Sequence, residues 1–213
     1  MEDLQRLGEG MDMQNNKTIE KNGLILSEDG KIVMGVADSS ITNVIIPEGV
    51  EEIADSALAH CYHLKSVSLP WGLRKIGKCA FMKCWSIENI VIPNDLEEIG
   101  DFAFHGCELK KVVLPEGLVS LGSEVFLNSG LQNITIPSTI RKIGKNAIFS
   151  FNNIEAHIHI INFSRVGGLD NLYVPKTTIY VPAGFAEFYR QHPLFSKLTI
   201  IEEMLYIKGG MTF

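Results

Sequence analysis

The sequence predicts a β-rich α/β solenoid, a stack of about five regular coils, each about 22–23 residues long. Two motifs that recur in phase support this prediction. The first ends in proline and returns once per coil, as Ile45-Ile46-Pro47, Ser68-Leu69-Pro70, Val91-Ile92-Pro93, Val113-Leu114-Pro115 and Ile136-Pro137. The second keeps the same spacing, as Ala57-Leu58, Ala80-Phe81, Ala103-Phe104, Val125-Phe126 and Ala147-Ile148. Similarity at a fixed period of this length is typical of stacked repeats, in which each coil buries its apolar face against its neighbours.

Within one coil, the pattern predicts a strand, a corner and a turn. In the second copy, residues 64–69 alternate apolar and polar side chains, which is the period of a half-buried strand. Pro70 ends this strand because it has no N–H to donate. Gly77 is then expected to permit a tight corner. Residues 80–84 are expected to form one short helical turn with its Phe and Cys buried.

The two ends of the chain depart from this pattern. Residues 24–26 and 32–34 flank a Gly-containing loop, which predicts a hairpin that shields the edge of the first coil. Two segments have the sequence of a strand ending, at residues 172–175 and 179–182. They are too close together for a full coil to separate them. Residues 184–191 suit a short helix. The predicted organisation is one continuous domain over 19–205, divided into a flexible tail (1–18), a hairpin cap (19–40), the repeat array (41–151), and a degenerate repeat with an irregular C-terminal cap (152–213).

The repeat pattern L-x-x-V-x-L-P-x-x-L-x-x-I-G-x-x-A-F-x-x-C resembles the BspA-like leucine-rich repeat over residues 41–151, and residues 179–189 resemble the capping segment that often follows such arrays. The resemblance implies a curved, right-handed solenoid, often secreted or on a bacterial surface, that serves adhesion and protein binding. It implies no catalytic residues. The chain departs from the pattern where Ile148 replaces the expected Phe, and through residues 152–177.

Composition excludes several classes of function. The net charge is −6, the pI is near 5.5, and Lys and Arg form no run, which argues against nucleic acid as a partner. No stretch approaches the roughly 20 apolar residues that span a bilayer. The first ten residues lack the apolar core of a secretion signal, so we expect either a trimmed leader with a secreted or cell-surface location, or a cytoplasmic protein. No nucleophile elbow, phosphate-binding glycine loop or carboxylate pair is present, and we expect no enzyme activity and no cofactor.

The candidate binding surface is the face of the strands that points away from the core. Its central column is mostly apolar or aromatic, although it should meet water, and lies beside three further aromatic residues. Such clusters are typical anchors for a protein partner. The alternative is that β-branched residues favour strands and the aromatic rings pack locally. The column is Ile45, Ser68, Val91, Val113, Thr135 and, less securely, Tyr180, and the neighbouring aromatic residues are Tyr62, Trp71 and Trp85.

Cysteine and histidine positions have structural interpretations. Cys61, Cys84 and Cys107 recur once per coil, and stacked side chains run parallel, so we expect buried thiols instead of disulfides. His157 and His159 have a spacing that a metal could use, but no third ligand follows at a telling distance. The register here is open: one choice turns these histidines inward, and a slip of one residue buries Ile158 and Ile160 instead. We favour the second register.

An exposed pair of residues recurs at the corner of each coil and is charged in four of the five, so stacking would place acid over base over acid. Each exposed pair contributes at most about 1 kcal/mol, so the pattern serves the register of the coils more than their stability. The pairs are Glu51-Glu52, Arg74-Lys75, Glu97-Glu98, Val119-Ser120 and Arg141-Lys142.

Together these observations predict a non-catalytic binding module that presents a concave strand face to a protein partner or a surface glycan, as a monomer or weak homo-oligomer. A structural or oligomerisation unit of a longer surface protein is the alternative. A metal protein or enzyme built on residues 152–177 is the third possibility.

Overall fold

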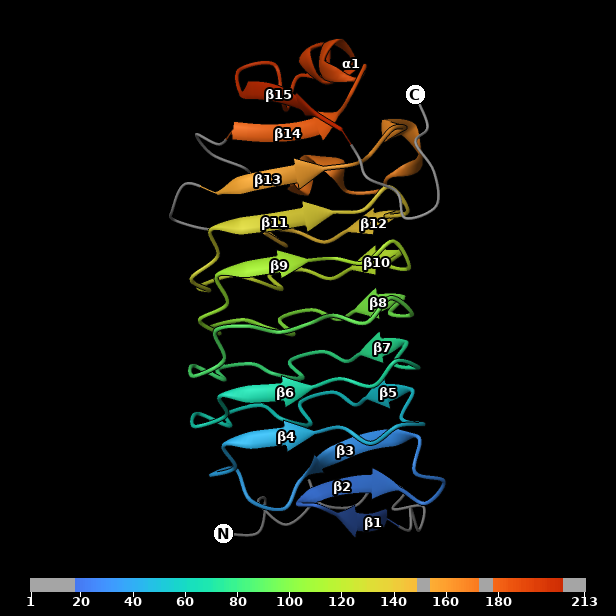
Figure 1. Cartoon of the computed structure of the whole chain (residues 1–213), viewed down its shortest axis with the longest axis vertical. Coiled ribbons are helices and arrows are strands. Elements are labelled where there is room, and N and C mark those ends of the chain that lie inside the picture. The colour runs from blue at the N-terminus through green and yellow to red at the C-terminus, as the bar shows by residue number, and fades with distance from the viewer. Residues whose placement is uncertain (1–17, 149–153, 173–177, 205–213) are drawn as a thin grey trace, which may run out of the picture.

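The computed structural model describes residues 18–148, 154–172 and 178–204. It is an elongated stack of coils, with the N-terminal strands at one end and a short α-helix, α1 (Ala186–Arg190), at the other (Figure 1). Neighbouring coils pair in parallel along the stack, as in the pairs Val44 with Val67 and Val112 with Ile134. The predicted solenoid is therefore confirmed.

One side of the stack, here called the strand face, is built from the strands that precede the proline motif. Its inward residues are buried and its outward residues are exposed, which is the predicted alternation. Val67, Ile90 and Val112, one per coil, are all buried. The strands are β4 (Asn43–Ile45), β6 (Ser66–Ser68), β9 (Lys111–Val113), β11 (Asn133–Ile136), β13 (Glu155–Ile158), β14 (Thr178–Pro182) and β15 (Thr199–Glu203).

The strand face is interrupted between β6 and β9. Residues 89–91 occupy the intervening level, yet they form no regular strand and join the next coil through the isolated bridge between Asn89 and Lys111. The rungs therefore fall into a two-stranded sheet, β4-β6, and a five-stranded sheet, β15-β14-β13-β11-β9, and Figure 1 shows the level without an arrow between them.

The corner of each coil forms a second, eight-stranded sheet, here called the corner sheet. Its first strands form an antiparallel unit in which β2 pairs with β3, so the predicted hairpin is present, and β3 pairs in parallel with β5. The order is β1 (Thr18–Lys21), β2 (Leu24–Ser27), β3 (Ile32–Val36), β5 (Glu52–Ile53), β7 (Lys75–Ile76), β8 (Glu98–Ile99), β10 (Ser120–Leu121) and β12 (Lys142–Ile143).

The third segment of each coil is a run of turns. The prediction of a short helix in this segment is therefore wrong. In the first coil, the N–H of Ala57 bonds to the carbonyl of Ala54, while the N–H of Leu58 reaches the carbonyl of Ala80 on the next coil at 2.8 Å. A helix would keep these bonds within its own coil, whereas turns release every second donor to tie neighbouring coils together. Left-handed φ values recur at two positions of this segment to allow this. The first position has a φ of 54° to 60° at Ser56, Cys79, Phe102, Glu124 and Asn146, and the position four residues later has a φ of 57° to 71° at His60, Lys83, Gly106 and Asn128.

Gly77 has a different role from the one predicted. Its φ is not in the left-handed region, but a Cβ there would lie 2.7 Å from the backbone of Asp55 on the preceding coil. The same close approach recurs at Gly100, where a Cβ would lie 2.6 Å from the backbone nitrogen of Lys78. Glycine is needed here because two backbones meet, not because the chain bends sharply.

Regular stacking continues beyond residue 151. Ile134, Ala156, Ile179 and Ile200 pair in succession, one residue per coil, so the spacing along the chain stays close to that of the array. The segment 172–175 falls largely outside the described residues, so its predicted strand ending is untested, as are the predicted tail and domain boundaries. The C-terminal part also contains the 3-10 helices η1 (Phe163–Arg165) and η2 (Leu169–Asn171).

The buried side chain of Tyr189 ties the short α1 helix to the preceding coil. The Tyr189 hydroxyl lies 2.8 Å from the carbonyl oxygen of Ile158 and 2.7 Å from that of Ile160. Around it, Phe163 stacks on Phe188 with ring centroids 4.3 Å apart. The helix therefore covers the end of the core next to β13.

Candidate functional site

The predicted central column lies on the strand face as expected and is partly apolar. Val91 is 84% exposed, Ile45 is 73% exposed and Val113 is 53% exposed. Their inward neighbours, such as Val44 and Val112, are buried, so the outward residues are not needed for the core. Ser68 is also exposed, and Thr135 is half-buried. The column therefore presents separate apolar side chains to solvent on a surface built from successive coils.

The same column continues to β15 and includes two residues that the sequence analysis did not assign to it. Thr135 pairs with His157, His157 pairs with Tyr180, and Tyr180 pairs with Ile201. The rings of His157 and Tyr180 stack with centroids 4.6 Å apart. A spacing of 22 residues from Thr135 leads to His157, whereas Ile201 follows Tyr180 after 21 residues and was placed in the column only by the structure.

The favoured register of residues 156–160 is confirmed. Ile158 and Ile160 are buried, and His157 and His159, which alternate with them along the chain, point outward. His157 Nδ1 lies 2.8 Å from Glu203 Oε2, and His159 Nε2 lies 3.3 Å from Glu203 Oε1. Glu203 belongs to β15, two strands away from β13, so it joins the last three rungs of the strand face.

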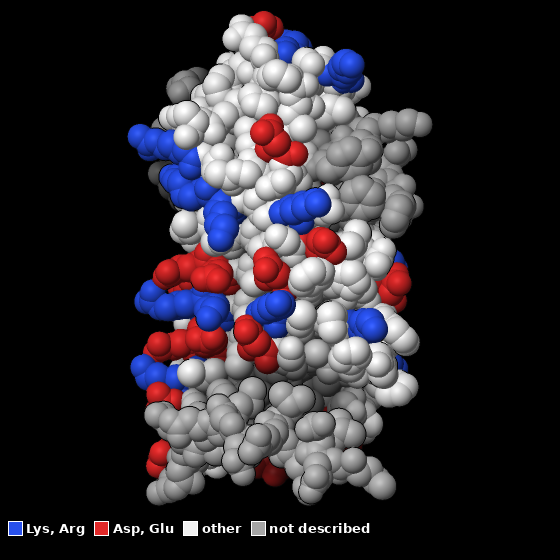
Figure 2. Space-filling model, turned by 180° about the vertical axis from the view of Figure 1, so that it is seen from behind, with Lys and Arg blue, Asp and Glu red and all other residues white. Residues whose placement is uncertain are grey.

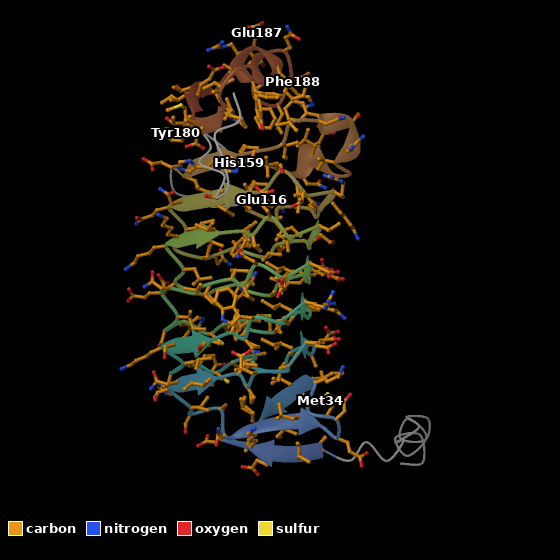
Figure 3. The ribbon with its side chains drawn as sticks, turned by 45° about the vertical axis from the view of Figure 1, so that its right-hand side comes forward. Met34, Glu116, His159, Tyr180, Glu187 and Phe188 are labelled. Atoms are coloured by element: carbon orange, nitrogen blue, oxygen red, sulfur yellow. The ribbon has the colours of Figure 1, made fainter. Side chains whose placement is uncertain are left out.

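A second carboxylate approaches this pair of histidines. Glu116 Oε1 lies 3.8 Å from His159 Nδ1, and Glu116 also accepts from Ser138 Oγ at 2.8 Å. Figure 3 shows Glu116, His159 and Tyr180 in the same part of the stack. The interaction with His159 lowers the pKa of Glu116 below its ordinary value, partial burial opposes this shift, and the bonds from Ser138 add to it. No group of His, Cys, Asp and Glu side chains within the described ranges is arranged to hold a metal ion.

Two of the three predicted aromatic residues contact each other. The rings of Tyr62 and Trp85 stack with centroids 4.6 Å apart, at the edge of the strand face where the strands begin. His60 Nδ1 lies 2.8 Å from the Tyr62 hydroxyl. Trp71 follows Pro70 at the opposite edge, is 70% exposed, and has no ring contact with this pair. The structure therefore separates Trp71 from the other two.

Two open hollows border Trp85. The first has a volume of about 650 Å³ and is lined by Lys65, Ser66, Trp85, Ser86, Glu88 and Asn89. The second has a volume of about 470 Å³ and is lined by Lys83, Trp85, His105, Gly106, Glu108 and Asn128. Sequence analysis did not predict them, because each depends on how neighbouring coils meet.

The charged corner pairs of the first three coils stack as predicted. Lys75 Nζ lies 2.9 Å from Glu52, and Arg74 lies 2.6 Å from Glu97 on the next coil. Figure 2 shows acidic and basic side chains alternating along one edge of the rear face. These pairs are largely exposed, so they contribute little stability.

The cysteine column is buried and reduced. Cys61, Cys84 and Cys107 are free and buried, and Cys79 is less buried. The Cys84 thiol donates to the carbonyl of Leu58 at 3.1 Å, and the Cys107 thiol to that of Phe81 at 3.2 Å. These thiols therefore donate hydrogen bonds to carbonyl groups of the preceding coils, which is a structural role.

Parallel coils of nearly constant length, a strand face and a proline after each rung define a bacterial-type leucine-rich repeat solenoid. The chain matches the family described as BspA type leucine rich repeat region in six copies, over residues 36–155 and 74–183, and it belongs to that family. Its members are typically protein-interaction or adhesion modules. A comparison with curated protein sequences finds no match.

Solved structures share the fold. The pneumococcal vaccine antigen PcpA has a TM-score of 0.66 at 20% identity, and the match covers 92% of this chain and 49% of that one. The leucine-rich repeat protein TpLRR of T. pallidum has a TM-score of 0.60 at 24% identity, covering 85% of this chain and 94% of that one. A leucine-rich repeat protein of Eubacterium ventriosum has a TM-score of 0.53 at 18% identity, and the match covers 65% of this chain and 40% of that one. The chain thus spans about half of PcpA and most of TpLRR.

Among the described residues, no helix has both the length and the apolar character that a membrane crossing requires.

Proposed function

We propose that the chain is a non-catalytic recognition module that binds a protein partner through the strand face. The observation that carries this proposal is the exposure of Ile45, Val91 and Val113 in one column of a regular array. Removing such side chains from water is favourable, and apolar residues at the centre of a patch are typical of protein interfaces.

The scaffold supports this role because it holds most of the column on a fixed backbone. Hydrogen bonds between coils fix the corner sheet, the turns and the paired rungs of the strand face, and Val91 lies between such rungs at the level that has no regular strand. A surface that is ordered before binding loses little conformational entropy on contact with its partner. Apolar residues on such a surface can therefore contribute most of their burial energy to affinity.

Self-assembly through the open end of the corner sheet is less favoured. The terminal strand β1 is exposed along its length, and it carries Glu20 and Lys21. Charged side chains on an edge strand oppose pairing with another chain. The oligomerisation alternative therefore has weaker support than recognition through the strand face.

The test compares two exposed valines on different surfaces. Immobilised wild-type chain, Val91→Asp and Val119→Asp are incubated with extracts of the cells that the protein meets, cross-linked and analysed by quantitative mass spectrometry. We expect a partner that binds the wild type and Val119→Asp but binds Val91→Asp at least about tenfold more weakly, because a carboxylate must be desolvated at the interface.

Circular dichroism and thermal unfolding establish that both variants remain folded. Val119 is the matched control, since it is exposed and lies at the corner of its coil beside β10. Equal capture of the same proteins by Val91→Asp and wild type would overturn the proposal.

A further inference from the structure

Two departures from the regular repeat meet at Trp85. The first is the missing strand at residues 89–91, and the second is a turn in the next coil that is one residue shorter, since one residue separates Cys107 from Leu109 whereas two separate Cys84 from Ile87. Trp85 lines a hollow at each of these places and is 54% exposed. A repeat pattern that breaks at one exposed aromatic residue indicates a local role for that residue.

The first hollow results from the interruption of the strand face. Ser66 belongs to β6. Asn89 lies on the next coil and pairs with Lys111 on the coil after that, so it does not extend the parallel pairing from β6. Ser66 and Asn89 both line the hollow. Polar backbone and side-chain groups at this level are therefore accessible from outside.

The second hollow results from the shorter turn. The residue after each column cysteine is Tyr62, then Trp85, then Glu108, and the coil of Glu108 has one residue fewer before its strand. The neighbouring Gly106 contributes no side chain, and a Cβ there would lie 3.7 Å from Trp85 Nε1. The column of rings therefore ends at Trp85, with open space beyond it.

The indole of Trp85 is held in place. Tyr62 stacks on it, and Tyr62 is itself bonded to His60 through its hydroxyl. Because Tyr62 belongs to the preceding coil and the second hollow is bounded by Gly106 and Glu108 of the following coil, the hollow borders the indole from the side opposite to Tyr62. An immobilised ring beside an accessible space is a platform on which a flat ligand surface can stack.

The lining favours a neutral, hydroxyl-rich ligand. Each hollow has one lysine and one glutamate, Lys65 and Glu88 in the first and Lys83 and Glu108 in the second. This balance disfavours a polyanion such as a nucleic acid, and the polar side chains around the indole offer hydrogen-bond partners to a hydroxyl-rich ligand. His105 and Asn128 add polar groups to the wall of the second hollow, where His105 Nε2 lies 3.5 Å from Asn128 Nδ2.

We propose that Trp85 and its two hollows form a binding site for a neutral glycan. The C–H face of a hexopyranose would stack on the indole, and its hydroxyl groups would exchange hydrogen bonds with the amide, carboxylate and ammonium groups around it. The two hollows on either side of one ring fit a chain of sugars better than a single monosaccharide. This site goes beyond the proposed protein-binding column and does not depend on Val91.

The two tryptophans of the chain allow a direct test. Trp71→Phe leaves Trp85 as the only indole, so its fluorescence reports on the site. This variant is titrated with cellohexaose, maltohexaose, mannohexaose and N-acetylchitohexaose, with heparin as a polyanion. We expect a saturable change of emission with at least one neutral oligosaccharide and none with heparin.

Calorimetry then compares Trp85→Ala with Trp71→Ala for the same oligosaccharide. We expect Trp85→Ala to bind at least about tenfold more weakly and Trp71→Ala to bind like the wild type. Both side chains are exposed, so both variants should fold, and circular dichroism checks this. A lack of response to all four oligosaccharides, a preference for heparin, or equal losses in the two variants would overturn the proposal. Retained glycan binding by Val91→Asp separates this site from the protein-binding column.

Discussion

The ring of Phe104 lies parallel to the ring of Phe81, with centroids 5.2 Å apart and an interplanar angle of 3°. Phe126 lies on the other side of Phe104, 5.8 Å away and parallel to within 2°. All three rings are fully buried, and Ile148 is buried one coil further on, where the pattern would have another Phe. Phe104 is thus the central member of a stack that joins three coils.

Replacing Phe104 with Ala should therefore lower the free energy of unfolding by about 3–5 kcal/mol, because it removes a buried ring and leaves a cavity between two others. Chemical denaturation monitored by circular dichroism measures the loss. Val91→Ala is the control, since an exposed side chain should change stability by less than about 0.5 kcal/mol. A loss below about 1 kcal/mol for Phe104→Ala would show that the ring stack is not a core.

The glycine column predicts a second difference in stability. Gly100→Ala should destabilise the protein by about 1–3 kcal/mol, because the added Cβ would press against the backbone of Lys78. Gly72→Ala is the matched control: no atom lies within 4 Å of a Cβ at that position. Thermal unfolding of both variants provides the comparison. Equal midpoints would mean that the coils do not approach each other as closely as the structure shows.

Thiol labelling should distinguish Cys79 from the cysteine column. Burial raises the pKa of Cys107 to about 12, so its thiol stays protonated and unreactive at neutral pH. Cys79 is less buried, and we expect it to react first with iodoacetamide in the native protein. Mass spectrometry identifies the labelled positions. Cys79→Ser should abolish native labelling, and denaturant should expose the remaining three thiols; rapid native labelling of Cys107 would contradict the buried column.

Glu116 should make stability depend on pH in the acid range. Its pKa in the folded chain is lower than the ordinary 4.5, so its carboxylate stabilises the fold above the unfolded pKa. This contribution is lost as the pH falls through the folded pKa. Glu116→Gln should therefore be less stable than the wild type at pH 7, and the difference should shrink below about pH 4.5.

Urea denaturation from pH 3 to pH 8 measures this effect. Glu48→Gln is the control, because Glu48 also follows a proline at the end of a rung and is exposed. A difference between Glu116→Gln and wild type that stays constant across this range would show that the carboxylate of Glu116 gains nothing from His159 and Ser138.

Much of the candidate site was predictable because it follows the repeat. The outward positions of Ile45, Val91 and Val113 follow from alternation along each strand and from the fixed spacing between coils. The contact between Tyr62 and Trp85 was only suggested by their equal place in the repeat. Their separation from Trp71 required coordinates, because Pro70 places Trp71 at the other edge of the strand face. Which of the three aromatic residues act together was therefore decided by geometry.

The amino-acid sequence alone determined the solenoid, its period and its buried columns, because each of these is a local pattern repeated along the chain. The tertiary structure decided what happens between coils: the missing strand at residues 89–91, the hollows beside Trp85, and the contact of His157 with Glu203 on a later coil. It also showed that Gly77 is needed because two backbones approach each other closely, not because the chain bends sharply. The physical reason is that these features depend on the distance between backbones in neighbouring coils, and a linear pattern records spacing along the chain but not that distance.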